Sequence, residues 1–352
     1  MRVRLDLEST LDAASGLSSH AHPAGCPHSH LSQTTAGPVV YAFASRGGTD
    51  PSGGAKTNQD RLIVKDALGG VTKRALFGVL DGHGPDGNAA AKYVKQALPK
   101  ALLSELEFET HIGKALSRAF LSVNQDLSIS SVDAYVSGAA GAVAMLQGSE
   151  LTVAHVGDCQ VVVGRDMTAE ERSGGLDLEV FAESLTPPHR PDAESEARRI
   201  TDAGGRIFEW GVPRVWLADV DMPGIAITRS FGDVVAENVG VHAQPDILKL
   251  TLTPKHKYIV MASDGVWAAM PPQEVMNIVH DARSLGAREA ADAVLTQAQT
   301  HWQSNEDATD DMSIIVLLLY YGTDQGFAAV PGGAGGNAGA AFEPAAAAFE
   351  FA

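Results

Sequence analysis

Short apolar runs recur along the middle of the chain, and each is bounded by Gly, Pro or polar residues. The clearest run covers residues 76–80 and leads directly into Asp81, Gly82, His83 and Gly84. Runs of this length with such boundaries are typical of buried strands. Strands are therefore predicted over residues 39–45, 72–80, 137–146, 151–156, 161–164, 180–185, 258–263 and 312–321, with a further strand inside residues 56–64.

Between these runs, apolar residues recur every three or four positions, which is the spacing of an amphipathic helix. Helices are predicted over residues 88–103, 109–127, 190–203, 271–283 and 287–302. Strands mingled with helix pairs favour an α+β fold with mainly antiparallel sheets over a doubly wound parallel sheet. Residues 206–223 contain several Gly and Pro positions and are predicted to form an irregular segment that projects from the surface.

The two ends of the chain differ from the middle in composition. Residues 1–37 are polar, and residues 323–352 are rich in Gly and Ala, so both are predicted to be disordered tails around one domain at 38–322. The N-terminal tail carries four histidines and a cysteine, namely His20, His22, Cys26, His28 and His30. Such a tract can bind transition metals, but a tail without a specific ligand is the favoured interpretation.

Charge and cysteine content narrow the possible partners. Of the 352 residues 45% are hydrophobic, and 43 acidic against 26 basic residues give a formal net charge of −17. An acidic surface argues against nucleic-acid binding and against adhesion to anionic lipid. Two cysteines give no disulfide framework, and we find no signal peptide or membrane-spanning run. We expect a monomer in a reducing compartment, the cytoplasm and/or the nucleus.

Several aspartates share one setting, in which an Asp adjoins a predicted strand end and has small or polar neighbours. They are Asp60, Asp81, Asp264 and Asp310, with Asp158 as a fifth candidate. Mg²⁺ and Mn²⁺ prefer oxygen ligands, so carboxylates that converge on one rim could hold two such ions, and the backbone carbonyl of Gly82 could contribute. Two ions ~3.5–4 Å apart could share a bridging water and lower its pKa, which would produce hydroxide near neutral pH.

Two further residues extend this hypothesis toward phosphate chemistry. Lys56 lies four residues before Asp60 and could bind a phosphate, and His83 could protonate a leaving alkoxide. Each residue also has an ordinary structural interpretation: Asp-Gly pairs are common in turns, most lysines are solvated, and most single histidines are structural. The ordered set taken together favours the functional interpretation.

Over residues 39–321 the chain resembles the metal-dependent protein serine/threonine phosphatases of type 2C. The motifs that carry the resemblance, in order, are 56–60, 81–84, 157–158, 185–191, 196–205, 228–233, 262–267 and 310–313. Residues 213–217 with Pro223 and Gly224 resemble the plant and protist branch. The family implies a four-layer α/β/β/α sandwich of two antiparallel sheets flanked by helix pairs, with a flap at about 206–223 beside the cleft.

The resemblance also implies roles for individual residues. Asp81 would bridge two Mg²⁺ or Mn²⁺ ions per subunit, Gly82, Asp264 and Asp310 would complete the protein ligands, and Asp60 would act largely through water. Lys56 matches the residue that binds phosphate, and His83 matches the general acid. The substrates implied are proteins that carry phosphoserine or phosphothreonine.

The chain departs from the family pattern at Ala140, Gln160 and Ala268, where Thr, Arg and an acid are usual. The acid and Asp158 are associated with a third, weaker metal, so the departures leave that third ion open. Two other functions are also open. One is a phosphatase-shaped scaffold, catalytically weak or inactive, that binds protein partners through the flap. The other is a metallohydrolase that acts on small phosphate esters or nucleotides.

Overall fold

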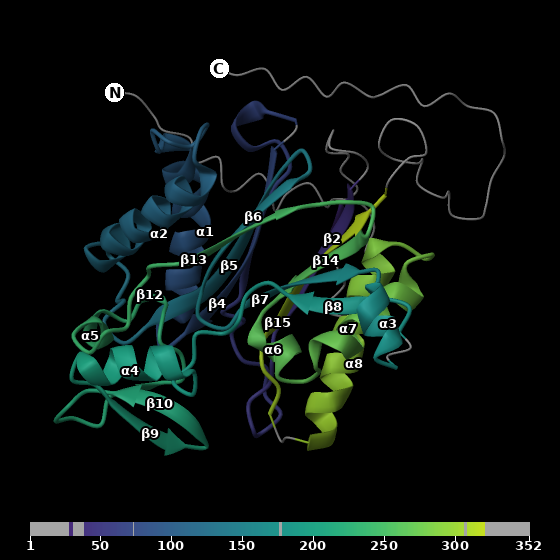
Figure 1. Cartoon of the computed structure of the whole chain (residues 1–352). Helices are drawn as coiled ribbons and strands as arrows, with labels where there is room; N and C mark the ends of the chain where they lie inside the picture. The colour runs from purple at the N-terminus through teal and green to yellow at the C-terminus, as the bar shows by residue number, and fades with distance from the viewer. Residues whose placement is uncertain (1–27, 31–38, 73, 176–177, 306–307, 321–352) are drawn as a thin grey trace, which may run out of the picture.

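Two antiparallel sheets lie face to face at the centre of the protein (Figure 1). The computed structural model describes residues 28–30, 39–72, 74–175, 178–305 and 308–320. The first sheet has the order β1-β2-β15-β14-β7-β8. Its strands are β1 (His28–His30), β2 (Val39–Arg46), β7 (Gln160–Arg165), β8 (Phe181–Ser184), β14 (His256–Ala262) and β15 (Met312–Leu319).

The second sheet has the order β13-β6-β5-β4-β3, and the short β12 pairs with β5. Its strands are β3 (Arg61–Lys65), β4 (Arg74–His83), β5 (Gly138–Gln147), β6 (Glu150–Val156), β12 (Phe231–Gly232) and β13 (Asp246–Thr251). The pairing of β4 with β5 places Asp81 opposite Ala140 and His83 opposite Gly138. The catalytic candidates on β4 are therefore fixed by strand register.

Two pairs of helices cover the outer faces of the sheets. Helices α1 (Gly87–Ser104) and α2 (Ile112–Ser128) pack on the second sheet, and α7 (Pro272–Ala282) and α8 (Ala287–Asn305) pack on the first. The remaining helical segments are short: η1 (Leu68–Gly70), α3 (Ala169–Ser173), α4 (Glu194–Asp202), α5 (Val234–Glu237) and α6 (Asp264–Trp267). The predicted α/β/β/α sandwich is confirmed.

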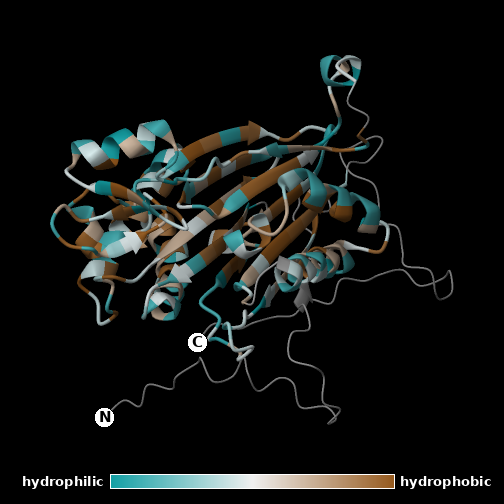
Figure 2. Ribbon diagram, turned by 90° about the horizontal axis from the view of Figure 1, so that it is seen from below, coloured by the Kyte–Doolittle hydropathy of each residue, from teal (hydrophilic) through white to brown (hydrophobic). Residues whose placement is uncertain are grey.

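Strand β4 shows how the sequence builds the layers. Successive side chains of a strand point to opposite faces. Leu76 and Leu80 pack in the cluster under α1 and α2, whereas Phe77 and Val79 pack between the two sheets. All four are fully buried. Because both faces of this strand are covered, it has an almost continuous apolar sequence, and the strands at the centre of Figure 2 are accordingly brown.

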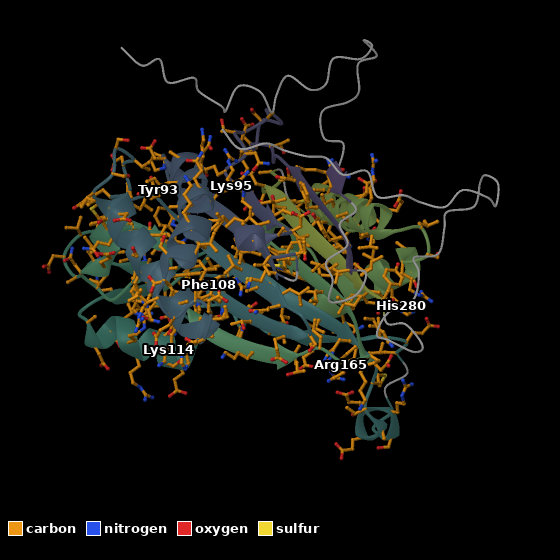
Figure 3. The ribbon with its side chains drawn as sticks, turned by 90° about the horizontal axis from the view of Figure 1, so that it is seen from above. Tyr93, Lys95, Phe108, Lys114, Arg165 and His280 are labelled. Atoms are coloured by element: carbon orange, nitrogen blue, oxygen red, sulfur yellow. The ribbon has the colours of Figure 1, made fainter. Side chains whose placement is uncertain are left out.

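Polar side chains lie on the outside of the sandwich. Figure 3 shows Tyr93, Lys95 and Lys114 on the side of α1 and α2, and Arg165 and His280 on the side of the first sheet. Arg165 donates to Glu171 at 2.8 Å and 2.9 Å, so it attaches the short α3 to the end of β7. None of the described helices is long and apolar enough to cross a membrane.

The structure corrects three local predictions. Strand β4 does not end at residue 80 but continues through Asp81 to His83. Asp264 does not end a strand, because β14 stops at Ala262 and Asp264 begins α6. Residues 206–223 are irregular only at 211 and 217–222. They form β9 (Arg206–Trp210) and β10 (Val212–Trp216), and these strands make a separate sheet with β11 (Pro223–Ile225), because their cross-strand pairs outweigh the local Gly and Pro signals.

The predicted tails fall mostly outside the described residues. The exception is His28–His30, which forms β1 and pairs with β2, so the prediction of a wholly disordered segment 1–37 is wrong for these three residues. His20, His22 and Cys26 and the predicted C-terminal tail at 323–352 lie outside the described residues.

Candidate metal centre

A cavity of about 340 Å³ opens where the two sheets and the β9–β11 sheet meet. Six of the residues singled out in the sequence line it: Asp81, Gly82, His83, Asp158, Asp264 and Asp310. They come from β4, the segment after β6, the first turn of α6 and the segment before β15. Folding thus gathers acidic side chains that are up to 229 positions apart, from 81 to 310, around one space.

Asp81 and Asp264 lie close enough to share a hydrogen bond. Burial, reinforced by the charge of Asp264, raises the pKa of Asp81 well above its usual range. Burial and the neighbouring Asp158 raise the pKa of Asp264 to about 7. Two carboxylates at this distance cannot both be ionised without a compensating cation. This pair therefore has the chemistry of a divalent-cation site.

Asp60 lies behind this pair and does not line the cavity. Its Oδ2 accepts a hydrogen bond from Ser263 Oγ at 2.7 Å, but its buried Oδ1 has no hydrogen-bond partner. Burial raises the pKa of Asp60 to about 7. A buried carboxylate oxygen without a donor is costly, and a metal-bound water would satisfy it. The donor set therefore fits hard divalent cations.

The adjacent residues Asp310 and Asp311 have different surroundings. Asp310 lines the cavity and pairs with Lys56 Nζ. Asp311 is buried and accepts from the backbone N–H groups of Gly48 at 2.7 Å and Gln59 at 2.9 Å. Asp311 thereby holds the loop that carries Lys56 against β15. Burial lowers the pKa of Lys56, but Asp310, together with Asp311 and Asp81, raises it overall, so Lys56 is a permanent cation beside the cavity.

The side chain of His83 is held by Asp233, an acid for which the sequence predicted no role. Its Nε2 lies 2.7 Å from Oδ2 of Asp233, and the same oxygen accepts from Ser230 Oγ at 2.6 Å. Burial disfavours the imidazolium, but the Asp233 carboxylate, with Asp158 and Asp264, raises the pKa of His83 overall. Asp233 is almost fully buried and adopts a left-handed backbone conformation with φ 51°. In the sequence, only the position of Asp233 at the end of the motif 228–233 pointed to this residue.

Asp158 already has a cationic partner, Arg190, whose Nη2 and Nε lie 2.9 Å and 3.2 Å from Oδ2 of Asp158. Ala140, one of the departures from the family pattern, also lines the cavity. An arginine that neutralises Asp158 lowers the attraction of this position for a third metal ion. The sequence placed Arg190 in a motif but did not indicate this pairing.

Gly82 is required by close packing. A Cβ at this position would lie 2.3 Å from the carbonyl oxygen of Gly87, the first residue of α1, and 2.8 Å from that of Gln59. Any side chain would separate β4 from α1 and move Asp81 and His83 with it. The contribution of the Gly82 carbonyl to metal binding stays a prediction.

The β9–β11 sheet reaches the cavity through Arg214 of β10 and Gly224 of β11. Arg214 Nη1 donates to the carbonyl of Gly224 at 2.7 Å. Within the described part of the chain this guanidinium has no carboxylate partner in an ion pair. Phe208 and Trp210 on β9 are 63% and 70% exposed, and Trp210 stacks on Trp216. The predicted flap segment thus presents a cation to the cavity and aromatic rings to solvent.

Comparison with known proteins agrees with this geometry. The protein phosphatase 2C family model matches residues 45–306. Probable protein phosphatase 2C 64 of Oryza sativa subsp. japonica is 35% identical over 275 residues, which cover 74% of this chain and 62% of that protein. Probable protein phosphatase 2C 35 of Arabidopsis thaliana is 30% identical over 303 residues, which cover 80% of this chain and 84% of that protein. The chain thus spans about three fifths of the length of the rice relative.

A solved structure shares the fold. The serine-threonine phosphatase 2C from Toxoplasma gondii matches with a TM-score of 0.70 at 21% identity, and the match covers 83% of this chain and 98% of that one. The family match, the plant relatives and the shared sandwich confirm the resemblance found in the motifs. The chain therefore belongs to the protein phosphatase 2C family, in its plant-like branch.

Proposed function

We propose that this protein hydrolyses phosphoserine and phosphothreonine in other proteins with the help of two Mg²⁺ or Mn²⁺ ions. The observation that carries the proposal is the convergence of Asp81, Asp264 and Asp310 on one cavity, with Asp60 directly behind them. Asp81, Gly82, Asp264 and Asp310 would hold the ions, and Asp60 would act through water. When bound, the ions neutralise charge and supply an activated water for in-line attack on phosphorus.

The residues around the cavity support the remaining steps. Lys56, which pairs with Asp310, would bind a phosphate oxygen of the substrate as a fixed positive charge. As the bond between phosphorus and the seryl oxygen breaks, His83 would donate its proton to the leaving alkoxide. Because Nε2 of His83 is directed at Asp233, Nδ1 is the nitrogen that would exchange this proton. We also propose a monomer that acts in the cytoplasm and/or the nucleus.

The decisive experiment is a phosphatase assay with and without divalent cations. Purified protein should release phosphate from a phosphothreonine peptide at ~mM Mg²⁺ or Mn²⁺, a level that suits water-rich carboxylate sites. A chelator should abolish the release, and added Mn²⁺ should restore it. No phosphate release at any Mn²⁺ concentration would favour the alternative of an inactive scaffold. A nucleotide that competes with the peptide and is itself hydrolysed faster would favour a small-ester hydrolase.

We predict that Asp233→Asn lowers kcat for a phosphopeptide by roughly 10²-fold with little change in KM, the usual scale of a lost general acid. Asparagine keeps the shape of Asp233 but cannot support the imidazolium of His83. The loss should be much smaller with p-nitrophenyl phosphate, because its leaving group needs no proton. Steady-state kinetics on both substrates measures this difference.

Two comparison variants control this prediction. His83→Asn should show the same dependence on the leaving group, whereas Asp202→Asn, at an exposed position of α4, should behave as the unaltered protein. An equal loss of kcat for both substrates would mean that Asp233 has only a structural role.

A further inference from the structure

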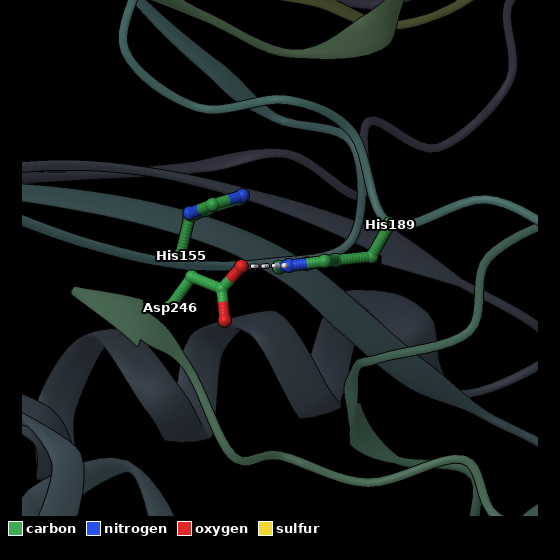
Figure 4. A group of neighbouring side chains, drawn as sticks. All are labelled: His155, His189 and Asp246. Atoms are coloured by element: carbon green, nitrogen blue, oxygen red, sulfur yellow. Dashed lines mark hydrogen bonds and ion pairs between the residues drawn. The ribbon is translucent and has the colours of Figure 1, made fainter. Parts of the chain in front are cut away.

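Two histidines and an aspartate form a second group of metal-ligating side chains, outside the cavity described above. The group consists of His155 on β6, Asp246 at the start of β13 and His189 in the segment after β8 (Figure 4). One ligand atom from each residue lies within 4.8 Å of the other two. His155 and His189 are 2% and 4% exposed, whereas Asp246 is open to solvent. An ion could therefore enter from the Asp246 side.

The backbone holds these residues in place before any ligand arrives. Asp246 and His155 are directly opposite each other in the antiparallel pair of β13 and β6. The backbone N–H of His189 donates to Gly157 at 2.9 Å, and its carbonyl accepts from Thr228 at 2.9 Å. These contacts fix the backbone positions of the three residues, so only side-chain torsions need to change on binding.

Both imidazoles are in the form that binds metals. Burial lowers the pKa of both histidines, and in addition the neighbouring His155 lowers that of His189, which falls to about 4. The rings are therefore neutral at physiological pH. His155 Nε2 lies 2.9 Å from the carbonyl of Pro187, which can only accept, so this nitrogen carries the proton and Nδ1 has a free lone pair. His189 Nδ1 is buried without a hydrogen-bond partner.

We propose that His155, His189 and Asp246 bind a transition-metal ion of the Zn²⁺ type, separate from the carboxylate centre. Nitrogen ligands select such ions over Mg²⁺. His189 Nε2 and Asp246 Oδ2 are 3.2 Å apart. In the metal-free protein this contact is a hydrogen bond from Nε2–H to the carboxylate. An ion here requires the other neutral tautomer of His189, with the proton on Nδ1, and the separation then suits a tetrahedral zinc site, in which bonds of about 2.0–2.1 Å place neighbouring ligands about 3.3 Å apart. The bond from His155 to a backbone carbonyl is the usual outer support of a metal-binding histidine.

Binding requires one local movement. The two rings stack with centroids 4.3 Å apart and planes at 11°, so a single ion cannot lie in the plane of both. One imidazole must turn about its Cβ–Cγ bond, a torsion that is broad for histidine. Arg229 contacts only Oδ1 of Asp246, at 2.6 Å, and is shared with Glu196. Oδ2 is therefore left to His189, the other proposed ligand. The ion would then have three protein ligands and one water.

The test is a Zn²⁺ titration of the full chain by calorimetry, in excess Mg²⁺ to occupy the carboxylate centre. His155→Asn, His189→Gln and Asp246→Asn should each bind one Zn²⁺ equivalent fewer than the unaltered protein, or bind it at least about tenfold more weakly. His256→Asn is the matched control and should bind as the unaltered protein does, because among the described residues the His256 side chain bonds only Thr253. The histidines at 20–30 are present in every variant, so any Zn²⁺ that they bind contributes equally to all of the titrations.

Two outcomes would overturn the site. One is equal Zn²⁺ stoichiometry and affinity in all five proteins. The other outcome needs no variant, so it holds even if a variant fails to fold. Co²⁺ in a tetrahedral nitrogen–oxygen site absorbs visible light strongly. The absence of such a band from the unaltered protein with Co²⁺ in excess Mg²⁺ contradicts the proposal. A thermal shift with Zn²⁺ that the three variants lose and the control keeps would support it, since an ion that binds only the folded state stabilises it.

Discussion

Replacing Asp81 with asparagine should lower phosphopeptide turnover by roughly a thousandfold or more, because the variant loses a central ligand charge and with it the cations that activate water. Asp81 lies within hydrogen-bonding reach of Asp264, and Asp60 and Asp158 also act on its charge. The measurement is the initial rate of phosphate release at saturating Mn²⁺.

The same variant should stay folded. Asp81 is surrounded by acidic side chains, and its raised pKa favours the neutral form in the metal-free protein, so a neutral asparagine of the same shape costs little stability there. Circular dichroism and thermal melting check the fold, and Asp126→Asn, at an exposed position of α2, serves as the matched control with full activity expected. An Asp81→Asn protein that turns over at the rate of the control would refute the assignment of the metal centre.

Metal-free protein should become less stable as the pH rises from 6.5 to 8.5. The pKa values of Asp60 and Asp264 are about 7 in the folded state, above the ordinary value of 3.8. The folded state therefore binds more protons than the unfolded state, and this stabilisation is lost as the pH rises through 7. Over this window the two groups together lower the free energy of unfolding by about 2 kcal/mol. This corresponds to a fall of roughly 4–8 °C in the melting temperature of a domain of this size.

Other titrating groups do not reverse this fall in stability with rising pH. The raised pKa of His83 acts in the same direction. The lowered pKa values of four histidines act in the opposite direction, mainly below their ordinary value of 6.5 and with a small remainder at the low end of the window: His155, His189, His242 and His256. The raised pKa of Asp81 acts against this remainder. Saturating Mg²⁺ should remove most of the dependence, because a cation replaces the shared protons, and Asp60→Asn should weaken it without metal. Melting curves at several pH values would contradict the prediction if stability were flat or rising in the metal-free protein.

Local sequence pattern was sufficient for the mixture of strands and helix pairs, whereas the four layers were implied by the family resemblance of the motifs. The apolar runs that became β4, β5, β14 and β15 are covered on both faces, so their composition alone marked them as buried strands. Helices α1, α2, α7 and α8 carry apolar residues at a spacing of three to four, which a sheet-covering helix needs. Element boundaries depend on cross-strand pairing. β4 extends three residues past the predicted end because pairing with Gly138 to Ala140 of β5 continues through His83.

The set of acidic candidates also came from the sequence, because Asp beside a strand end and a small residue is a local pattern. The sequence did not show which of these acids line the cavity and which hold other parts of the structure in place. Asp310 and Asp311 are neighbours in the sequence, yet one lines the cavity and the other holds the 47–60 loop. The partners Asp233 of His83 and Arg190 of Asp158 lie 150 and 32 positions away, and no local pattern links them.

The sequence by itself determined the two-sheet sandwich with its helix pairs, the family, and the residue types from which a cation centre could be built. These depend on periodicity and on short motifs, which act between near neighbours along the chain. Only the tertiary structure decided which carboxylates share a proton, which have an arginine or lysine beside them, and that His155, His189 and Asp246 meet. Such facts depend on distances between strands from distant parts of the chain, and those distances are set by sheet pairing and packing.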